Sequence, residues 1–307
     1  MNLLVANRGE IAIRVMRAAS ELDVRTTAVF SEDDDRSLHI RRADVARLLR
    51  GSGARAYLDA DQLLALAREE ECDAIHPGYG FLSENAEFAR RCAEAGITFV
   101  GPRPETLELC GDKGQARSLA ERCGVPILPG TSGPTELEEA REFFASLGNG
   151  AAIMVKAVAG GGGRGMRPVH RRGELEEAYE RCRSEAEAAF GNGDLYVERL
   201  IPRARHVEVQ IIGDGTGEVS HLWERECTLQ RRHQKLVDVA PSPGLPAHLR
   251  DRLTAAAIRM AEEVRYQSLG TFEFLFEVGA KAEGAAGEEA AFAFNEVNPR
   301  LQVEHTV

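Results

Sequence analysis

The sequence predicts a mixed fold in which a parallel α/β unit is followed by an antiparallel α+β unit. Two observations predict this fold. Up to about residue 102, short apolar runs alternate with stretches of helical periodicity, which is the pattern of a parallel sheet wound by helices. After residue 206, apolar and polar residues alternate with period two across tight turns, which indicates antiparallel strands.

The N-terminal pattern consists of four short apolar runs, and each run predicts a buried strand. A turn at 7–9 separates the first run from a helix whose apolar residues recur at helical spacing. A Gly-Pro-Arg-Pro stretch at 101–104 then marks a boundary. The four runs are 3–6, 27–30, 74–75 and 97–100, and the apolar helix positions are Ile11, Val15, Ala18, Ala19 and Leu22.

The rest of the chain predicts further strands and helices. A polar helical stretch runs to about Cys123, where Gly124-Val125-Pro126 breaks it. Segment 279–290 is rich in Ala, Gly and Glu, and we interpret it as a hairpin loop without a function of its own. Strands are expected at 153–155, 166–169, 195–198, 206–211, 218–224, 271–277 and 291–298, and helices at 173–190 and 247–265.

The composition argues against several classes of protein. The formal net charge is −11, and we expect no nucleic-acid partner because phosphate backbones are bound by clustered Lys and Arg. The 6 cysteines form no Cys-x-x-Cys pair and lie near no histidine cluster, which favours free thiols in a reducing compartment over a zinc site. No apolar window is long enough to span a membrane, and no signal peptide opens the chain. We therefore expect a cytoplasmic protein without a membrane partner.

The segment Gly160–Gly165 carries the first indication of chemistry. It matches G-x-G-x-x-G, but a dinucleotide-binding fingerprint needs a helix directly after it, and here Met166–Val169 reads as a strand. It is not a Walker A loop, because no Gly-Lys-Ser or Gly-Lys-Thr follows. We interpret it as a flap at a hairpin tip whose backbone N–H groups approach phosphate oxygens, with a flexible linker as the alternative. Lys156, which ends the preceding strand, can reach the same phosphates.

Two later strands carry carboxylates that can converge. In 271–276 the phenylalanines take one face and Glu273 the other, while Glu296 and Asn298 share a face of 292–298. If the two strands pair as a hairpin, these oxygen-bearing side chains suit Mg²⁺ (or Mn²⁺). The alternative is three solvated side chains on an exposed sheet face.

Two charged clusters flank this hairpin. Arg300 follows it directly and can form a bidentate contact with a carboxylate or phosphate, and Glu304 can act as a base near it. The basic cluster Gln230–Lys235 is of a kind that normally forms a solvated face. In an acidic chain, beside a turn-rich segment, it can instead gather an anion.

Together these segments resemble the biotin carboxylase family of ATP-grasp enzymes. The matching strings are ordered and spread over the whole chain, and QRRHQK and RLQVEH match the biotin branch of the superfamily. The strings include ANRGEIAIR (6–14), HPGYGFLSEN (76–85), GDK (111–113), VKAVAGGGGRGMRPV (155–169), ERECTLQRRHQK (224–235), GTFEFL (270–275) and NEVNPRLQVEHTV (295–307).

The resemblance implies three regions and a role for each candidate residue. Residues 1–111 would form a Rossmann-like (pre-ATP-grasp) domain, 112–200 the linker helices and a mobile glycine-rich lid, and 201–307 an incomplete C-terminal ATP-grasp subdomain. The implied nucleotide contacts are Lys113, Lys156, Gly162, Gly163, Glu198, Arg199, Ile201, His206, Gln230, His233, Glu273 and Glu296. The implied metal ligands are Glu273, Glu296 and Asn298. The implied bicarbonate site is Lys235, Arg300, Gln302, Val303 and Glu304, of which Lys235, Arg300 and Glu304 would be catalytic.

By the same resemblance, the activity is the ATP-dependent carboxylation of biotin with bicarbonate through carboxyphosphate. The implied partners are a biotin carboxyl carrier and a carboxyltransferase that acts on an acyl-CoA or pyruvate. Members of the family continue past the bicarbonate motif, so we expect the chain to be a monomer and its longer parent a homo-oligomer. Two alternatives stay open: a module that only binds ATP, and another ATP-grasp ligase such as a carbamoyl-phosphate-forming enzyme.

Overall fold

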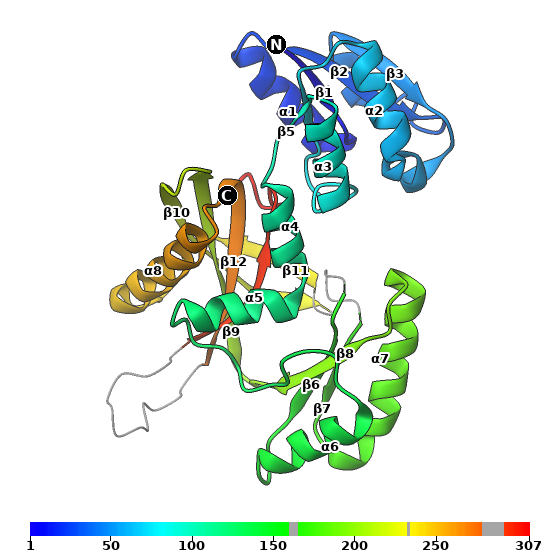
Figure 1. Ribbon diagram of the computed structural model, residues 1–307. Coiled ribbons are helices and arrows are strands. Elements are labelled where there is room, and N and C mark those ends of the chain that lie inside the picture. The colour runs from blue at the N-terminus through cyan, green and yellow to red at the C-terminus, as the bar shows by residue number, and fades with distance from the viewer. Residues whose placement is uncertain (160–164, 232–233, 278–291) are drawn as a thin grey trace.

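The computed structural model describes residues 1–159, 165–231, 234–277 and 292–307. They form a parallel sheet, a three-stranded sheet and an antiparallel sheet, each with its own helices (Figure 1). The predicted combination of a parallel α/β unit with antiparallel α+β units is confirmed. Residues Gly162, Gly163 and His233, and the predicted loop at 279–290, lie outside the described residues.

The N-terminal sheet is parallel, with strand order β3-β2-β1-β4-β5. Successive residues of β1 face opposite sides of the sheet: Leu4 packs with α2 and α3, whereas Leu3 and Val5 pack with α1. Helices therefore cover both faces, so only residues at the strand ends can contact a ligand. The elements are β1 (Asn2–Val5), α1 (Gly9–Glu21), β2 (Arg25–Ser31), β3 (Val45–Leu49), α2 (Ala60–Glu69), β4 (Ala74–His76), α3 (Ala86–Glu94) and β5 (Thr98–Phe99).

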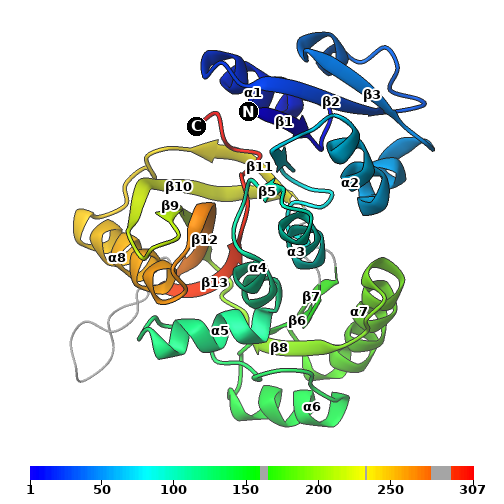
Figure 2. The ribbon, with the colours of Figure 1, turned by 45° about the horizontal axis from the view of Figure 1, so that its top comes forward.

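Two short helices, α4 (Pro104–Gly111) and α5 (Lys113–Arg122), follow the N-terminal unit and lie between it and the three-stranded sheet (Figures 1 and 2). The sequence predicted one continuous helical stretch here. The helix breaks at Asp112 because this residue is extended and its carboxylate caps α5 by accepting from the Gln115 N–H at 3.0 Å. The cap places Lys113 at the first helical position.

The three-stranded sheet has the order β7-β6-β8 and is antiparallel throughout. Ile153, Val155 and Val197 pack beneath α6 and α7, so Met154 and Lys156 face the other way. Strands β6 and β7 pair on either side of the glycine segment, which confirms the hairpin and contradicts a dinucleotide-binding turn. We call residues 131–199 the lid; its elements are α6 (Leu137–Ser146), β6 (Ile153–Ala157), β7 (Met166–Val169), α7 (Leu175–Phe190) and β8 (Leu195–Arg199).

The antiparallel sheet has the order β11-β10-β9-β12-β13, and with α4, α5 and α8 we call it the body. Its apolar face, which includes Val207, Phe272 and Phe274, packs against α5 and α8. Its other face carries charged residues. The elements are β9 (Ala204–Asp214), β10 (Val219–Arg231), β11 (Gln234–Val239), α8 (Ala247–Glu263), β12 (Gln267–Glu277) and β13 (Phe292–Asn298).

A β-bulge in β13 sets the direction of its polar side chains. Phe274 pairs with Phe294 and Glu273 with Glu296, so Asn295 is an extra residue in the ladder. Strict alternation would turn Phe294 and Glu296 to the same face. Because of the bulge, Phe294 lies in the core while Glu296 lines the cleft between body and lid.

A short segment of the chain crosses from the body to the lid. Pro126 O accepts from Phe294 N of the body at 2.7 Å, and Pro129 O accepts from Arg199 N of the lid at 2.8 Å. Gly130 is required there, because a Cβ at this position would lie 2.8 Å from Val197 O. The segment 126–131 thus joins both units through backbone hydrogen bonds.

Candidate functional site

A cleft of about 240 Å³ lies between the lid sheet and the antiparallel sheet. Met154, Lys156 and Glu198 line it from the lid, and strands of the body line the opposite side. Eight of the predicted nucleotide contacts lie together in this cleft: Lys113, Lys156, Glu198, Arg199, Ile201, His206, Gln230 and Glu296. Glu273 contacts this group through His206, since His206 Nε2 and Glu273 Oε2 are 2.5 Å apart.

Apolar side chains in the cleft escaped the sequence analysis. Leu128, Met154, Met166 and Leu275 line it together with Ile201. In the sequence they look like ordinary core residues. The alternation of side chains in β6 could have identified Met154 from the sequence, because it places Met154 on the same face as Lys156. A flat aromatic ring, such as a nucleotide base, fits a wall of this kind.

Two lysines enter the cleft from different elements. Lys113 Nζ donates to Ala157 O at 3.1 Å, and burial lowers the pKa of this lysine. Lys156 forms an ion pair with Glu198 and donates to Asn295 Oδ1, the bulge residue of the body, at 3.2 Å. Burial alone would lower the pKa of Lys156, but the neighbouring Glu198 outweighs it and the pKa is raised. Both groups present positive charge to a phosphate-sized ligand.

Arg117, which the sequence analysis also missed, lies behind Glu198. Its guanidinium contacts Glu198 Oε2 at 3.3 Å and donates to Leu128 O at 2.9 Å. Only 7% of Arg117 is exposed, although the surrounding sequence of α5 is polar. Its two partners are distant in sequence or belong to the backbone, so no local pattern marks it.

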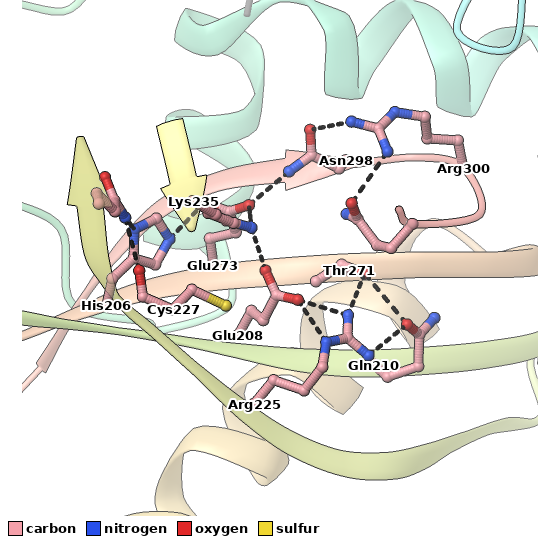
Figure 3. A network of polar contacts seen from close by, with 12 residues as sticks. His206, Glu208, Gln210, Arg225, Cys227, Lys235, Thr271, Glu273, Asn298 and Arg300 are labelled. Carbon is pink, nitrogen blue, oxygen red and sulfur yellow. Dashed lines mark hydrogen bonds and ion pairs between the residues drawn. The ribbon is translucent and has the colours of Figure 1, made fainter. Parts of the chain in front are cut away.

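On the charged face of the antiparallel sheet, side chains of opposite sign alternate in a continuous chain (Figure 3). Arg225 Nε donates to Glu208 at 2.6 Å, and Lys235 bridges Glu208 and Glu273, the latter at 2.8 Å. Asn298 Nδ2 donates to Glu273 Oε1 at 2.7 Å. The basic cluster predicted at 230–235 therefore does not act as one unit. Lys235 joins this network, whereas Arg231 is exposed.

Glu273 and Glu296 pair directly across β12 and β13, but their environments differ. Burial raises the pKa of Glu296, and the adjacent Glu273 raises it further. Burial also opposes ionisation of Glu273, yet His206 and Lys235 outweigh it and its pKa is lowered. The two facing carboxylates are oxygen ligands of the kind that suits Mg²⁺, while Asn298 turns its Nδ2 to Glu273 and its Oδ1 to Arg300. Across the described ranges, no group of three or more His, Cys, Asp and Glu side chains is placed to hold a metal ion.

Arg300, Gln302 and Glu304 follow β13 and border the N-terminal unit. Arg300 Nε donates to Glu84 at 2.5 Å and its Nη1 donates to Gln302 Oε1 at 3.0 Å. Gln302 Nε2 and Glu304 Oε2 are buried without a hydrogen-bond partner among the residues that the structure describes. Burial raises the pKa of Glu304. The unused Gln302 donor belongs to a side chain that contacts the guanidinium, and with the unused Glu304 acceptor it suits a small anion that also carries a proton. Val303, the remaining predicted member, is 54% exposed.

Two families match consecutive parts of the chain. The family described as "Biotin carboxylase, N-terminal domain" matches residues 1–107, and "Carbamoyl-phosphate synthase L chain, ATP binding domain" matches residues 112–307. The chain is 53% identical to pyruvate carboxylase of Bacillus subtilis and 51% identical to mitochondrial pyruvate carboxylase of Homo sapiens. These alignments cover 99% of this chain but only 26% and 25% of those proteins. The chain thus spans about a quarter of the length of these relatives.

Solved structures give the same result for the fold. Biotin carboxylase of Campylobacter jejuni, in a complex with β-γ-ATP, has a TM-score of 0.93 at 42% identity, covering all of this chain and 66% of that one. The biotin carboxylase domain of 2-oxoglutarate carboxylase from Hydrogenobacter thermophilus, in complex with MgADP and bicarbonate, has a TM-score of 0.92 at 43% identity, covering all of this chain and 65% of that one. The ATP-grasp fold expected from the sequence is therefore confirmed.

Proposed function

Because this chain belongs to the biotin carboxylase family of ATP-grasp enzymes, we propose that it carboxylates biotin with bicarbonate at the expense of ATP. The observation that best supports this proposal is the pair of buried, unpartnered groups in the segment that follows Arg300, the Gln302 donor and the Glu304 acceptor. The charge of Lys235, which contacts Glu273, acts on Glu304 and links this end of the chain to the charged face of the sheet. A module that only binds ATP has no need of such a pair.

The proposed roles follow the geometry. Lys113 and Lys156 neutralise the phosphates of ATP, while the apolar wall and the backbone of 198–201 hold the base. Glu273, Glu296 and Asn298 would hold Mg²⁺ (or Mn²⁺), which supplies charge neutralisation to the phosphoryl oxygens. We keep three further nucleotide contacts that the resemblance implies: Gly162 and Gly163 of the glycine flap, and His233.

The chemistry proposed for the bicarbonate side uses three groups. Glu304 removes the bicarbonate proton, and its raised pKa makes it a better base than an ordinary glutamate. Arg300 and Lys235 hold the carbonate oxygens, one of which attacks the γ-phosphorus to give carboxyphosphate and ADP. Carboxyphosphate breaks into CO₂ and phosphate. The phosphate takes the proton of the biotin ureido nitrogen, which then attacks CO₂.

The longer protein is part of the same proposal. A biotin carboxyl carrier and a carboxyltransferase would complete it, and the relatives at 51% and 53% identity favour pyruvate as the final acceptor over an acyl-CoA. A cytoplasmic location and a homo-oligomeric parent stay predictions, as do the boundaries at 111 and 200. Within the described ranges, no helix is long and apolar enough to cross a bilayer.

The test is ADP release with and without bicarbonate and free biotin. We expect ADP release that requires bicarbonate and increases with biotin. ATP binding by calorimetry without any bicarbonate-dependent release would favour the module that only binds ATP. Bicarbonate-dependent release that biotin leaves unchanged would favour a ligase for another acceptor, such as the carbamoyl-phosphate-forming class.

A further inference from the structure

Arg117 is a buried cation that neither the sequence motifs nor the proposed chemistry uses. It projects from α5 of the body and contacts the lid strand β8 at Glu198, with an Nη1 to Oε2 distance of 3.3 Å. Its Nη2 also donates to Leu128 O, in the segment that crosses from body to lid, at 2.9 Å. It therefore lies at the point where the two units meet.

Glu198 is shared between two cations. One carboxylate oxygen faces Lys156 and the other faces Arg117, and the Glu198 side chain is 6% exposed. Lys156 has two further attractions, since it already donates to Asn295 and would turn to phosphate oxygens in the proposed reaction. A carboxylate that is paired with a lysine compensates its charge, so the lysine attracts a phosphate less strongly.

We propose that Arg117 is a positioning residue of the nucleotide site, which holds the Glu198 carboxylate when Lys156 leaves it for the phosphate oxygens of a bound nucleotide. The inference rests on the proposed nucleotide role of the cleft. Breaking a buried ion pair is costly when it leaves one charge uncompensated. With Arg117 in place, the carboxylate keeps a partner after Lys156 moves, so the transfer leaves no buried charge unpaired.

The chemistry of arginine suits this role. A guanidinium stays charged at any relevant pH and offers several N–H groups in a fixed plane, so it can hold Leu128 O and Glu198 at once. A lysine offers a point charge on a flexible stem and is less able to span both acceptors. Neither contact of Arg117 faces the phosphates, so it acts through Glu198 and is not itself a phosphate ligand.

The experiment compares ligands with and without phosphates. Calorimetry on the full chain measures MgADP and adenosine binding for the wild type and for Arg117→Met. Adenosine does not draw Lys156 away from Glu198, so its affinity should change less than twofold. The affinity for MgADP should fall about tenfold to a hundredfold, as for the loss of a charged hydrogen bond. Equal losses for both ligands would overturn the inference, because general damage to the cleft weakens both.

Two further variants separate the inference from its alternatives. In Arg117→Met combined with Glu198→Gln, the neutral amide needs no cation, so the ratio of MgADP to adenosine affinity should return to within about threefold of the wild type. This variant also lacks the buried unpaired charge, and it keeps the test usable if Arg117→Met alone does not fold. A ratio that stays low in the double variant would overturn the role through Glu198.

A matched control lies on the same helix. Arg122 ends α5 and is exposed, so Arg122→Met should bind both ligands as the wild type does. Loss of MgADP affinity in that variant equal to the loss in Arg117→Met would overturn the inference. Failure of the wild type to bind MgADP would contradict the proposed function of the cleft. If the wild type binds MgADP and Arg117→Met binds it equally well, only the role of Arg117 is overturned.

Discussion

The molecule contains two five-stranded sheets that use their faces differently. The parallel N-terminal sheet has α1 on one face and α2 with α3 on the other, so its strands are apolar on both sides. The antiparallel sheet is covered by α5 and α8 on one face only. A sheet covered on both faces leaves chemistry to its strand ends, whereas a sheet with one free face can carry charged groups along the strands.

The difference shows in where polar residues lie. In the N-terminal unit, Asn7 follows the end of β1 and its Nδ2 donates to Pro77 O at 2.6 Å and Tyr79 O at 2.8 Å, which organises the loop after β4. In the antiparallel sheet, Glu208 and Glu273 sit in mid-strand and are at most 2% exposed. Such buried carboxylates persist because each has cationic partners on the same face.

The largest expected effect tests the apolar face of the antiparallel sheet. Phe274 is fully buried and packs edge-on against Phe292 and Phe294. We expect Phe274→Ala to lower the free energy of unfolding by about 3–5 kcal/mol, measured by urea denaturation. Leu222→Ala is the control, since Leu222 is 60% exposed and its loss should stay within about 0.5 kcal/mol. Similar values for the two variants would contradict a one-sided core.

The next effect concerns the end of the charged face. Arg300→Ala should lower the rate of bicarbonate-dependent ADP release about 10²-fold to 10³-fold, as for loss of one group that stabilises a transition state. Arg231→Ala, at the exposed end of β10, is the matched control and should leave the rate unchanged. An unchanged rate in Arg300→Ala would remove Arg300 from the mechanism.

A pair of smaller effects has opposite signs. The pKa of Glu296 is raised, so the folded protein binds this proton more tightly than the unfolded chain does. The free energy of unfolding therefore falls as pH rises from the ordinary pKa of a glutamate through the raised pKa of Glu296. We therefore expect Glu296→Gln to stabilise the metal-free protein at neutral pH. Glu273 has a lowered pKa, and its stabilisation is present at neutral pH and lost as pH falls, so Glu273→Gln should destabilise.

Thermal unfolding of both variants without metal checks this contrast. Addition of Mg²⁺ and ADP should stabilise the wild type more than either variant, because each substitution replaces a charged carboxylate with a neutral amide. Two variants with shifts of the same sign would show that the neighbours of these carboxylates do not set their ionisation.

The smallest effect is a pH limb. Because burial raises the pKa of Glu304, the proposed base becomes deprotonated at higher pH than an ordinary glutamate. We expect kcat/KM for bicarbonate to rise with pH through this pKa, and the Glu304→Gln variant to lose this pH dependence. A pH profile with the same limb in Glu304→Gln would assign it to another group.

The sequence was most informative where periodicity reports burial directly. The alternation in 206–211 predicted a strand, and the alternation in 271–276 and 292–298 placed Glu273, Glu296 and Asn298 on one face of a hairpin. Strand β3 was not predicted because its side chains are half exposed and include Arg47, and β11 was not predicted because apolar residues such as Leu236 point to solvent. Helix α6 was also missed.

Features that depend on distant contacts were beyond the sequence. The bulge at Asn295 follows from the register with β12, which no local pattern reveals. Arg117 looks like a surface residue of a polar helix, and its partner Glu198 is 81 positions away. Lys156, Glu273 and Glu296 were named from strand patterns, and most other candidates came from the family resemblance. Arg117 gains its surroundings only from the assembled tertiary structure.

The short crossing from body to lid has a consequence for how such a protein can be rebuilt. Pro129 O and Arg199 N are 2.8 Å apart, so the chain leaves for the lid and returns from it at adjacent points. An excursion whose ends meet behaves as a cassette, since it can be exchanged with that of a relative without rerouting the rest of the chain. An exchanged cassette keeps its own lysine and glutamate, and it must still match the arginine and asparagine that remain behind.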